Sequence, residues 1–144
     1  MARTATRFLD NVIDANKYPL PQIAEKALRD RRIGLGIMGW AEMLVQMGLP
    51  YDSEEAVALG NRVMTFIKQK ALEESMALAE VRGPYPEWEG SQWHKAGLKV
   101  RNATLTTVAP TGTISCSRRG RTCRAPAASS PSSPWSSPGT RRAR

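Results

Sequence analysis

The motif with the clearest chemistry is a hexapeptide of small and hydroxyl-bearing residues that follows a run rich in β-branched residues. It consists of Pro110, Thr111, Gly112, Thr113, Ile114 and Ser115. If a helix begins within this motif, its free backbone N–H groups and its dipole face an anion, and the hydroxyl groups add further donors. Phosphate is the natural ligand for such donors. Taken alone, however, so short a motif favours an ordinary capped turn over a phosphate site.

A second glycine motif has the spacing of a dinucleotide-binding loop. Gly34, Gly36 and Gly39 form G-x-G-x-x-G, a pattern that can hold a pyrophosphate at a helix N-terminus. Such a loop follows a hydrophobic strand, whereas the residues before Gly34 include ALRDRR, and no second strand carries an acid about twenty residues later. The context therefore favours close packing of this backbone against neighbouring elements over the binding of NAD or FAD.

Residues 1–115 contain no arrangement typical of a catalytic or metal site. His94 is the one histidine of the sequence, and both cysteines, Cys116 and Cys123, come later with C-x6-C spacing. That spacing fits neither a zinc knuckle nor a C-x-x-C redox motif. Because His94 has no second ligand or catalytic partner, we expect a surface histidine. The sequence predicts no catalytic residue and no metal site here.

The strong positive charge of the chain is concentrated at its C-terminal end. The net charge is +8, but residues 116–144 hold seven arginines and no acid, so residues 1–115 carry 14 basic and 13 acidic side chains. A nearly neutral body does not predict specific nucleic-acid binding. No apolar run is long enough to span a membrane, and residues 1–10 lack the apolar core of a secretory signal. We expect no membrane association and a cytoplasmic location.

The composition changes abruptly after Ser115. Residues 116–144 are almost entirely Ser, Arg, Pro, Ala and Gly, and such a segment cannot bury enough apolar area to offset the entropy of ordering it. We therefore divide the chain into a body, residues 1–115, and a disordered tail, residues 116–144. The tail is either a basic arm that binds polyanions or the product of a frameshift, since GC-rich codons read out of frame tend to encode these residues. We favour the frameshift.

The body has mostly helical periodicity and one run typical of a strand. Apolar spacing and the positions of Pro, Gly and capping residues predict helices over residues 5–17, 21–31, 39–48 and 52–83. In the first of these, Phe8, Leu9, Val12 and Ile13 form the apolar face, with Asp10 on the opposite side. Residues 102–109 predict a strand. Since a lone strand cannot satisfy its backbone, the body belongs to a larger sheet or barrel.

Four sequence blocks together resemble the large catalytic subunit of ribonucleotide reductases, in order and spacing. They cover residues 8–23, 31–57, 78–91 and 101–115, and the last reads RNATLTTVAPTGTIS. This last block is most similar to the adenosylcobalamin-dependent class. The iron- or manganese-dependent class, whose loops are related but differ in sequence, is our alternative. The resemblance extends over about 110 residues, so it is far more specific than any single motif.

The resemblance implies a fold, a reaction and a role for the hexapeptide. The fold is an α/β type, part of a ten-stranded α/β barrel that is mostly helical in this segment. The reaction is radical reduction of the 2′ carbon of a ribonucleotide to supply deoxyribonucleotides for DNA synthesis, with adenosylcobalamin as the radical source and a dithiol of the thioredoxin type as reductant. The family's loop corresponding to residues 110–115 holds the substrate's phosphates through backbone amides and hydroxyls. The resemblance assigns no cofactor-binding residue in this segment.

The sequence also departs from the family pattern. The family's radical cysteine, in an Asn-x-Cys-x-Glu motif, does not occur in this chain, and Cys116 and Cys123 match no family position. We therefore expect the chain to be inactive alone. Two functions from other classes remain as alternatives: a small NAD-binding oxidoreductase, and a basic interaction protein that acts through its tail.

The frameshift hypothesis makes a direct prediction about the gene. Translation beyond the codon for Ser115 in the two other reading frames should reveal a continuation of the barrel sequence. Sequencing of the gene and its flanks checks this expectation. If neither frame continues the barrel, the tail is a genuine basic segment of the protein.

Overall fold

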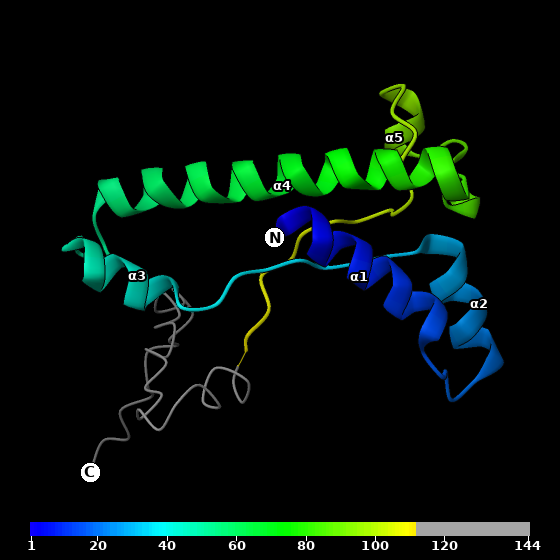
Figure 1. The fold of residues 1–144 in the computed structure, drawn as a ribbon, viewed down its shortest axis with the longest axis horizontal. Helices are drawn as coiled ribbons and strands as arrows, with labels where there is room; N and C mark the ends of the chain where they lie inside the picture. Colours follow the sequence, from blue (N-terminus) through cyan, green and yellow to red (C-terminus); the bar gives the residue numbers. More distant parts are fainter. Residues whose placement is uncertain (112–144) are drawn as a thin grey trace, which may run out of the picture. The chain divides into compact units, whose positions relative to one another are not determined.

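The structure is a computed structural model and describes residues 1–111. Four helices make up most of these residues (Figure 1). They are α1 (Ala2–Ala15), α2 (Pro21–Asp30), α3 (Trp40–Met47) and α4 (Glu54–Arg82). All four predicted helices are confirmed to within a few residues. Two short elements, η1 (Pro86–Trp88) and α5 (Gln92–Lys95), were not predicted. No described helix combines the length and the apolar character needed to cross a membrane.

The helix ends follow local sequence signals. Pro21 occupies the first turn of α2, and Gly48 ends α3 with a φ of 70°, a left-handed conformation that glycine adopts without strain. α4 begins at Glu54, two residues after the predicted start of this helix, because Ser53 is its N-cap. The Ser53 hydroxyl accepts a hydrogen bond from the backbone N–H of Ala56 at 3.2 Å.

The face that α1 presents to the core differs from the predicted one. Thr6, Asp10 and Ile13 are buried, while the Phe8 side chain is 64% exposed and Val12 is exposed as well. The predicted position of Asp10 on the outer side was therefore wrong. Apolar periodicity missed this orientation because arginines from elsewhere in the chain pair with the Asp10 carboxylate and make its burial favourable.

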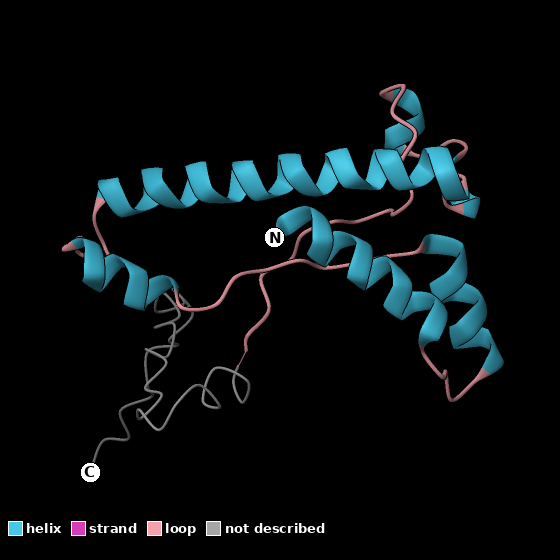
Figure 2. Ribbon diagram, viewed as in Figure 1, coloured by secondary structure: helices cyan, strands magenta, loops and turns pink. Residues whose placement is uncertain are grey.

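Two extended segments lie side by side, and we call residues 33–36 and 103–107 the extended pair (Figure 2). They run parallel and meet in a bridge between Leu35 and Thr106. The Leu35 N–H donates to the Leu105 carbonyl at 2.8 Å, and the Thr107 N–H donates to the Leu35 carbonyl at 3.1 Å. The predicted strand 102–109 is thus reduced to one bridge within residues 1–111. Its partner, residues 33–36, was not predicted.

The apolar core lies where α1 and α4 meet the extended pair. Its buried members come from each of these parts: Ile13, Ile33, Ala71 and Leu105, with Leu9, Leu35, Leu72 and Trp93 packed around them. Residues 1–109 form one compact unit around this core. The predicted boundary after Ser115 and the predicted tail, residues 116–144, lie outside the described residues.

Gly34 and Gly36 lie at the closest approach of the two extended segments. A Cβ atom at Gly34 would lie 2.6 Å from Thr107 Cγ2, and one at Gly36 would lie 2.7 Å from the Thr107 carbonyl oxygen. Both glycines therefore stand inside the extended pair and not in a turn that leads into a helix. The predicted role of this motif, close backbone packing, is confirmed for these two positions.

These two contacts predict different responses to a methyl group. Gly36→Ala should lower the free energy of unfolding by about 1–3 kcal/mol, because a backbone carbonyl must move to admit the new Cβ. Gly34→Ala should be destabilising too, but Thr107→Ala should rescue it, because that clash is with a side chain. Urea unfolding followed by circular dichroism measures the three single variants and the two double variants. Rescue of Gly36→Ala by Thr107→Ala would contradict this packing.

A buried carboxylate also joins α1 to α4. Glu74 on α4 accepts hydrogen bonds from the Nε atoms of Arg3 at 3.0 Å and Arg7 at 2.8 Å, and its side chain is only 6% exposed. Burial alone would raise the pKa of Glu74, but the hydrogen bonds and charges of the two arginines outweigh it and lower this pKa below its ordinary value near 4.5.

This shift predicts an acid-sensitive contact between α1 and α4. Because the folded pKa of Glu74 lies below the unfolded one, its stabilising contribution is complete above pH 4.5 and is lost as the pH falls through the folded value. Glu74→Gln should therefore weaken the pH dependence of unfolding below pH 4.5. Glu73→Gln is the matched control, since Glu73 pairs with Lys70 on the same helix and with no arginine of α1. Equal pH profiles for the two variants would contradict the assignment.

Candidate functional site

The structure describes two residues of the predicted phosphate loop, Pro110 and Thr111. Neither lies in a helix or a strand. The other predicted loop residues, Gly112, Thr113, Ile114 and Ser115, lie outside the described residues. The predicted phosphate-binding role of residues 110–115 thus stays a prediction.

Thr111 has an unusual backbone conformation. Its φ is 51°, in the left-handed region, which is uncommon for any residue with a side chain and costs most for a β-branched one. Such conformations cost about 1–3 kcal/mol and are concentrated at ligand-binding and active sites. The strain is therefore a reason to consider this position functional, independent of its side-chain chemistry.

The chain leaves the extended pair shortly before this loop. Thr107 makes the last hydrogen bond of the pair, and the next residue, Val108, is 93% exposed. The extended pair is parallel, so both segments have their carboxyl ends at the same edge. Ligands of α/β proteins bind at that edge of a parallel sheet.

At the other end of segment 103–107 lies a group of charged side chains around one buried carboxylate, which we call the charge cluster. It contains Asp10, Asp14, Arg31, Arg82 and Arg101.

Asp10, at the centre of this cluster, is fully buried. Its Oδ1 accepts from Arg31 Nη2 at 2.8 Å, and its Oδ2 accepts from Arg82 Nη1 at 2.9 Å. One carboxylate thereby joins α1 to the end of α2 and to the end of α4.

Asn102 connects the charge cluster to the extended pair. Its side chain is fully buried, and its Nδ2 donates to Asp10 Oδ1 at 2.9 Å and to the Arg31 carbonyl at 3.2 Å. Its Oδ1 accepts from the Ser75 hydroxyl at 3.0 Å. Both ends of the amide group are therefore satisfied, and its orientation is fixed by α1, α2 and α4 together.

The charges of this group perturb one another. The hydrogen bond from Arg31 lowers the pKa of Asp14 despite some desolvation of that carboxyl. Burial alone would lower the pKa of Arg31, but hydrogen bonds to Asp14 and Asp10 raise it. Burial and the nearby Arg31 charge lower the pKa of Arg101, whose Nε lies 3.8 Å from Asp10 Oδ2 without a hydrogen bond. The cluster therefore holds three guanidinium groups against two carboxylates.

His94 lies at the surface, as the sequence predicted. It is exposed, its Nδ1 accepts from the Gly90 N–H at 2.9 Å, and its ring centroid lies 4.4 Å from that of Trp88. Within residues 1–111 no group of three or more potential metal ligands comes together.

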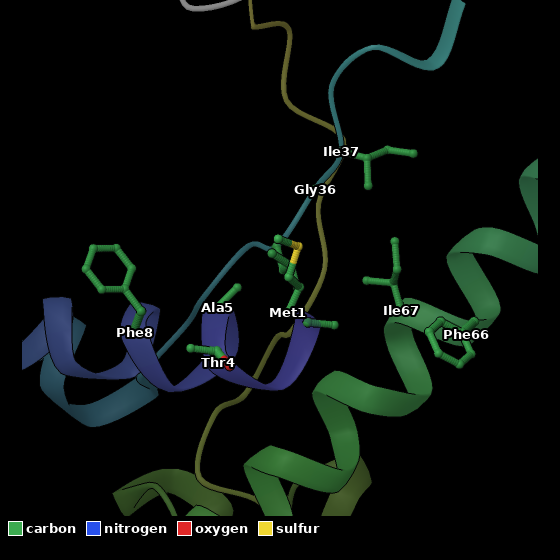
Figure 3. Close-up of a pocket in the computed structure, with 10 residues that line it drawn as sticks. Met1, Thr4, Ala5, Phe8, Gly36, Ile37, Phe66 and Ile67 are labelled. Atoms are coloured by element: carbon green, nitrogen blue, oxygen red, sulfur yellow. The ribbon is translucent and has the colours of Figure 1, made fainter. Parts of the chain in front are cut away.

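An apolar hollow of about 750 Å³ opens between α1, residues 35–37 and α4 (Figure 3). Phe8, Ile37, Phe66 and Ile67 are among its lining residues, and Thr4 provides the one polar side chain of the lining. Phe66 and Phe8 are each more than half exposed. The hollow thus suits apolar groups and offers little to a charged ligand.

Sequence reasoning did not find the charge cluster or its link through Asn102. The available signal was weak: Asp10 interrupts an apolar stretch of α1, and two arginines stand at positions 31 and 32 after a helix. The contacts that define the cluster join residues 21, 72 and 92 positions apart, which no local pattern reveals.

Comparison with known proteins places these features in a family. The family described as the barrel domain of ribonucleotide reductase matches residues 1–101. The vitamin B12-dependent ribonucleoside-diphosphate reductase of Thermoplasma acidophilum is 56% identical over 112 residues, which are 78% of this chain and 15% of that protein. The enzyme of the same name from Mycobacterium tuberculosis (strain CDC 1551 / Oshkosh) is 52% identical over 115 residues, 80% of this chain and 16% of that protein.

A solved structure agrees with these relatives. The alpha subunit of the class Id ribonucleotide reductase of Actinobacillus ureae superposes with a TM-score of 0.66 at 28% identity, covering 79% of this chain and 22% of that chain. The chain spans only 15–16% of the length of the two vitamin B12-dependent relatives. These matches show that the chain belongs to the ribonucleotide reductase family and corresponds to part of its barrel domain.

Proposed function

We propose that this chain is a segment of the catalytic barrel of a vitamin B12-dependent ribonucleoside-diphosphate reductase, and that residues 110–115 bind the phosphates of the ribonucleotide. The cofactor class follows from the two relatives at 52–56% identity, both named as vitamin B12-dependent, against 28% for the class Id structure. This difference favours the cobalamin-dependent class over the alternative iron- or manganese-dependent class.

One observation carries the phosphate assignment. Residues 110–115 follow the carboxyl end of a parallel extended segment, and Thr111, the first residue after the proline, holds a strained left-handed backbone. Backbone amides at such a position can point at an anion, and the Thr111, Thr113 and Ser115 hydroxyls supply further donors. Fixed donors of this kind hold the substrate in place while the reaction takes place at its sugar.

The extended pair supports the assignment to a barrel. Within the described residues, no backbone hydrogen bond engages the amides of Gly34, Gly36 or Thr106, which face away from the pairing between the two segments. Unpaired edges on both sides of a two-stranded unit require further strands, and a closed barrel provides them. We assign the two segments to adjacent strands of a ten-stranded barrel.

Adenosylcobalamin, which the proposal assigns to the whole enzyme as its radical source, has no fitting site among residues 1–111. The corrin ring carries many amide groups that need polar partners, but the hollow beside α1 has one polar side chain in its lining. The proposed part of these residues in the reaction is therefore limited to holding and orienting the substrate. A dithiol protein of the thioredoxin type remains the proposed reductant of the whole enzyme.

We further propose that the chain alone does not reduce nucleotides. The reaction needs a cysteine that forms the radical and a cysteine pair that supplies electrons, and residues 1–115 contain no cysteine. Turnover of ribonucleotides by the purified chain with adenosylcobalamin and a dithiol would contradict this statement.

The phosphate assignment predicts that the Thr111 hydroxyl contributes to nucleotide affinity. Thr111→Val keeps the size and branching of the side chain but removes its hydroxyl, so the dissociation constant for ADP should rise about tenfold, as expected when one hydrogen bond to a charged group is lost. Thr111→Ser keeps the hydroxyl, so its dissociation constant for ADP should be close to that of the wild-type chain. Nuclear magnetic resonance titration of the backbone amides of residues 111–115 measures all three.

Two controls make this test specific. Thr65→Val changes an exposed threonine of α4 in the same way and should leave ADP affinity unaltered. Adenosine, which lacks phosphates, should shift none of the amides of residues 111–115. If ADP shifts none of them either, residues 110–115 are not a phosphate site and the proposal fails.

A further inference from the structure

The two oxygens of the Asp10 carboxylate have different partners. Oδ1 accepts from Arg31 Nε at 3.1 Å, from Arg31 Nη2 at 2.8 Å and from Asn102 Nδ2 at 2.9 Å. Oδ2 accepts from Arg82 Nη1 at 2.9 Å. Through Oδ1, the carboxylate on α1 therefore holds the side chain of Asn102, the residue just before segment 103–107.

Asn102 is fixed on its backbone as well as its side chain. Its backbone N–H donates to the Ser75 hydroxyl at 3.2 Å, and the N–H of Arg101 donates to the Ser75 carbonyl at 3.1 Å. The next residue, Ala103, donates its N–H to the Asp30 carbonyl at 3.3 Å. The chain thus enters the extended pair from a position defined by α2, α4 and the Asp10 carboxylate.

Contacts within the extended pair favour its observed register: Gly34 and Gly36 pack closely against Thr107, and Thr104 Oγ1 donates to the Ile33 carbonyl at 2.9 Å. Residues 33–36 nevertheless include two glycines, and glycine-rich segments slip more easily because few side chains distinguish one register from the next. A slip by one residue would turn Leu105, which is 5% exposed, out of the core. An anchor at one end of the segment adds to these contacts and further disfavours a slip.

We propose that Asp10 is a positioning residue: by holding Asn102 it sets the register of segment 103–107 against residues 33–36, and so fixes the stem that leads into residues 110–115. The consequence for the substrate rests on the proposed function of that loop. Asp10 acts at the opposite end of segment 103–107 from the loop, and its influence passes along the backbone between Asn102 and Thr107.

Asp14 offers a matched control. It lies one helical turn after Asp10 on α1, and its two oxygens accept from Arg31 Nη1 at 2.7 Å and from Nη2 at 2.9 Å. It carries the same charge and shares the same arginine, but it makes no hydrogen bond to Asn102. Comparison of Asp10→Ala with Asp14→Ala therefore separates the contact to Asn102 from the loss of a carboxylate beside Arg31.

The experiment measures hydrogen exchange of single amides in the full 144-residue chain. The N–H groups of Leu35 and Thr107 report the register, since each donates across the extended pair, and the N–H of Ala71 in α4 serves as reference. Asp10→Ala should speed exchange at Leu35 and Thr107 at least tenfold relative to Ala71. Asp14→Ala should change this ratio less than twofold.

Asn102→Ala provides a second variant that leaves the ion pairs of Asp10 in place, in case Asp10→Ala does not fold. It should raise the same two exchange rates relative to Ala71 by a similar factor. If Asn102→Ala leaves them unchanged, or if Asp10→Ala raises all three rates equally, Asp10 supports general stability and the proposal is wrong.

ADP titration of the same variants tests whether the register of segment 103–107 affects ADP binding at the loop that follows it. Asp10→Ala and Asn102→Ala should weaken ADP binding, followed at the amides of residues 111–115, several-fold, and Asp14→Ala should not. Altered exchange with unaltered ADP affinity would overturn the link to the loop. If the unchanged chain does not respond to ADP, the proposed function fails, and the exchange rates alone then decide whether Asp10 sets the register.

Discussion

The described structure depends on the burial of one carboxylate. A fully buried anion costs several kcal/mol unless charged and polar partners surround it, and removal of one partner from such a pair costs about 3–5 kcal/mol. Asp10 obtains its partners from α2, α4 and the residue before the extended pair. Each partner is at the end of its element, so the position of each end is tied to α1. Arg31, Arg82 and Arg101 thereby place their charges around one carboxylate, where they join segments of the chain.

The two glycines of the extended pair complement this polar anchor. Gly34 and Gly36 allow the Thr107 side chain and carbonyl to approach closer than any Cβ atom would permit. The same residue types at the same spacing form a dinucleotide loop in other proteins, where they let a backbone approach a pyrophosphate. Both arrangements need space beside the backbone. A pyrophosphate fills this space in a dinucleotide loop, whereas Thr107 fills it here. Position within the chain, inside a paired segment and four residues or more before α3, decides between the two.

The sequence predicted what depends on neighbouring residues and missed what depends on distant ones. Helix bounds were predicted because Pro21, Gly48 and Gly83 act within one turn of the helix ends. The buried face of α1 was not, because periodicity places apolar residues inside and cannot anticipate Arg82, 72 residues away. Segment 33–36 was missed because its pairing comes from residues 104–107 and its own composition includes two glycines. The candidate loop, residues 110–115, was predicted from its residue types and the family resemblance, and its phosphate-binding role stays a prediction. Of its two threonines the structure describes Thr111, whose backbone is left-handed.

Within residues 1–111 the buried polar groups have nearly all of their partners, whereas some large apolar side chains and strand-edge amides do not. This difference indicates which contacts would join the segment to the rest of a barrel. The buried polar groups around Asp10 and Asn102 find nearly all their partners within residues 1–111. The apolar side chains of Phe8 and Phe66 and the amides at the edges of the extended pair do not. Exposed apolar surface and free strand edges are features that neighbouring elements cover. Local geometry at the entry to the loop is therefore encoded within the segment by directional hydrogen bonds, whereas its attachment to the rest of a barrel relies on less directional apolar contacts and on strand pairing.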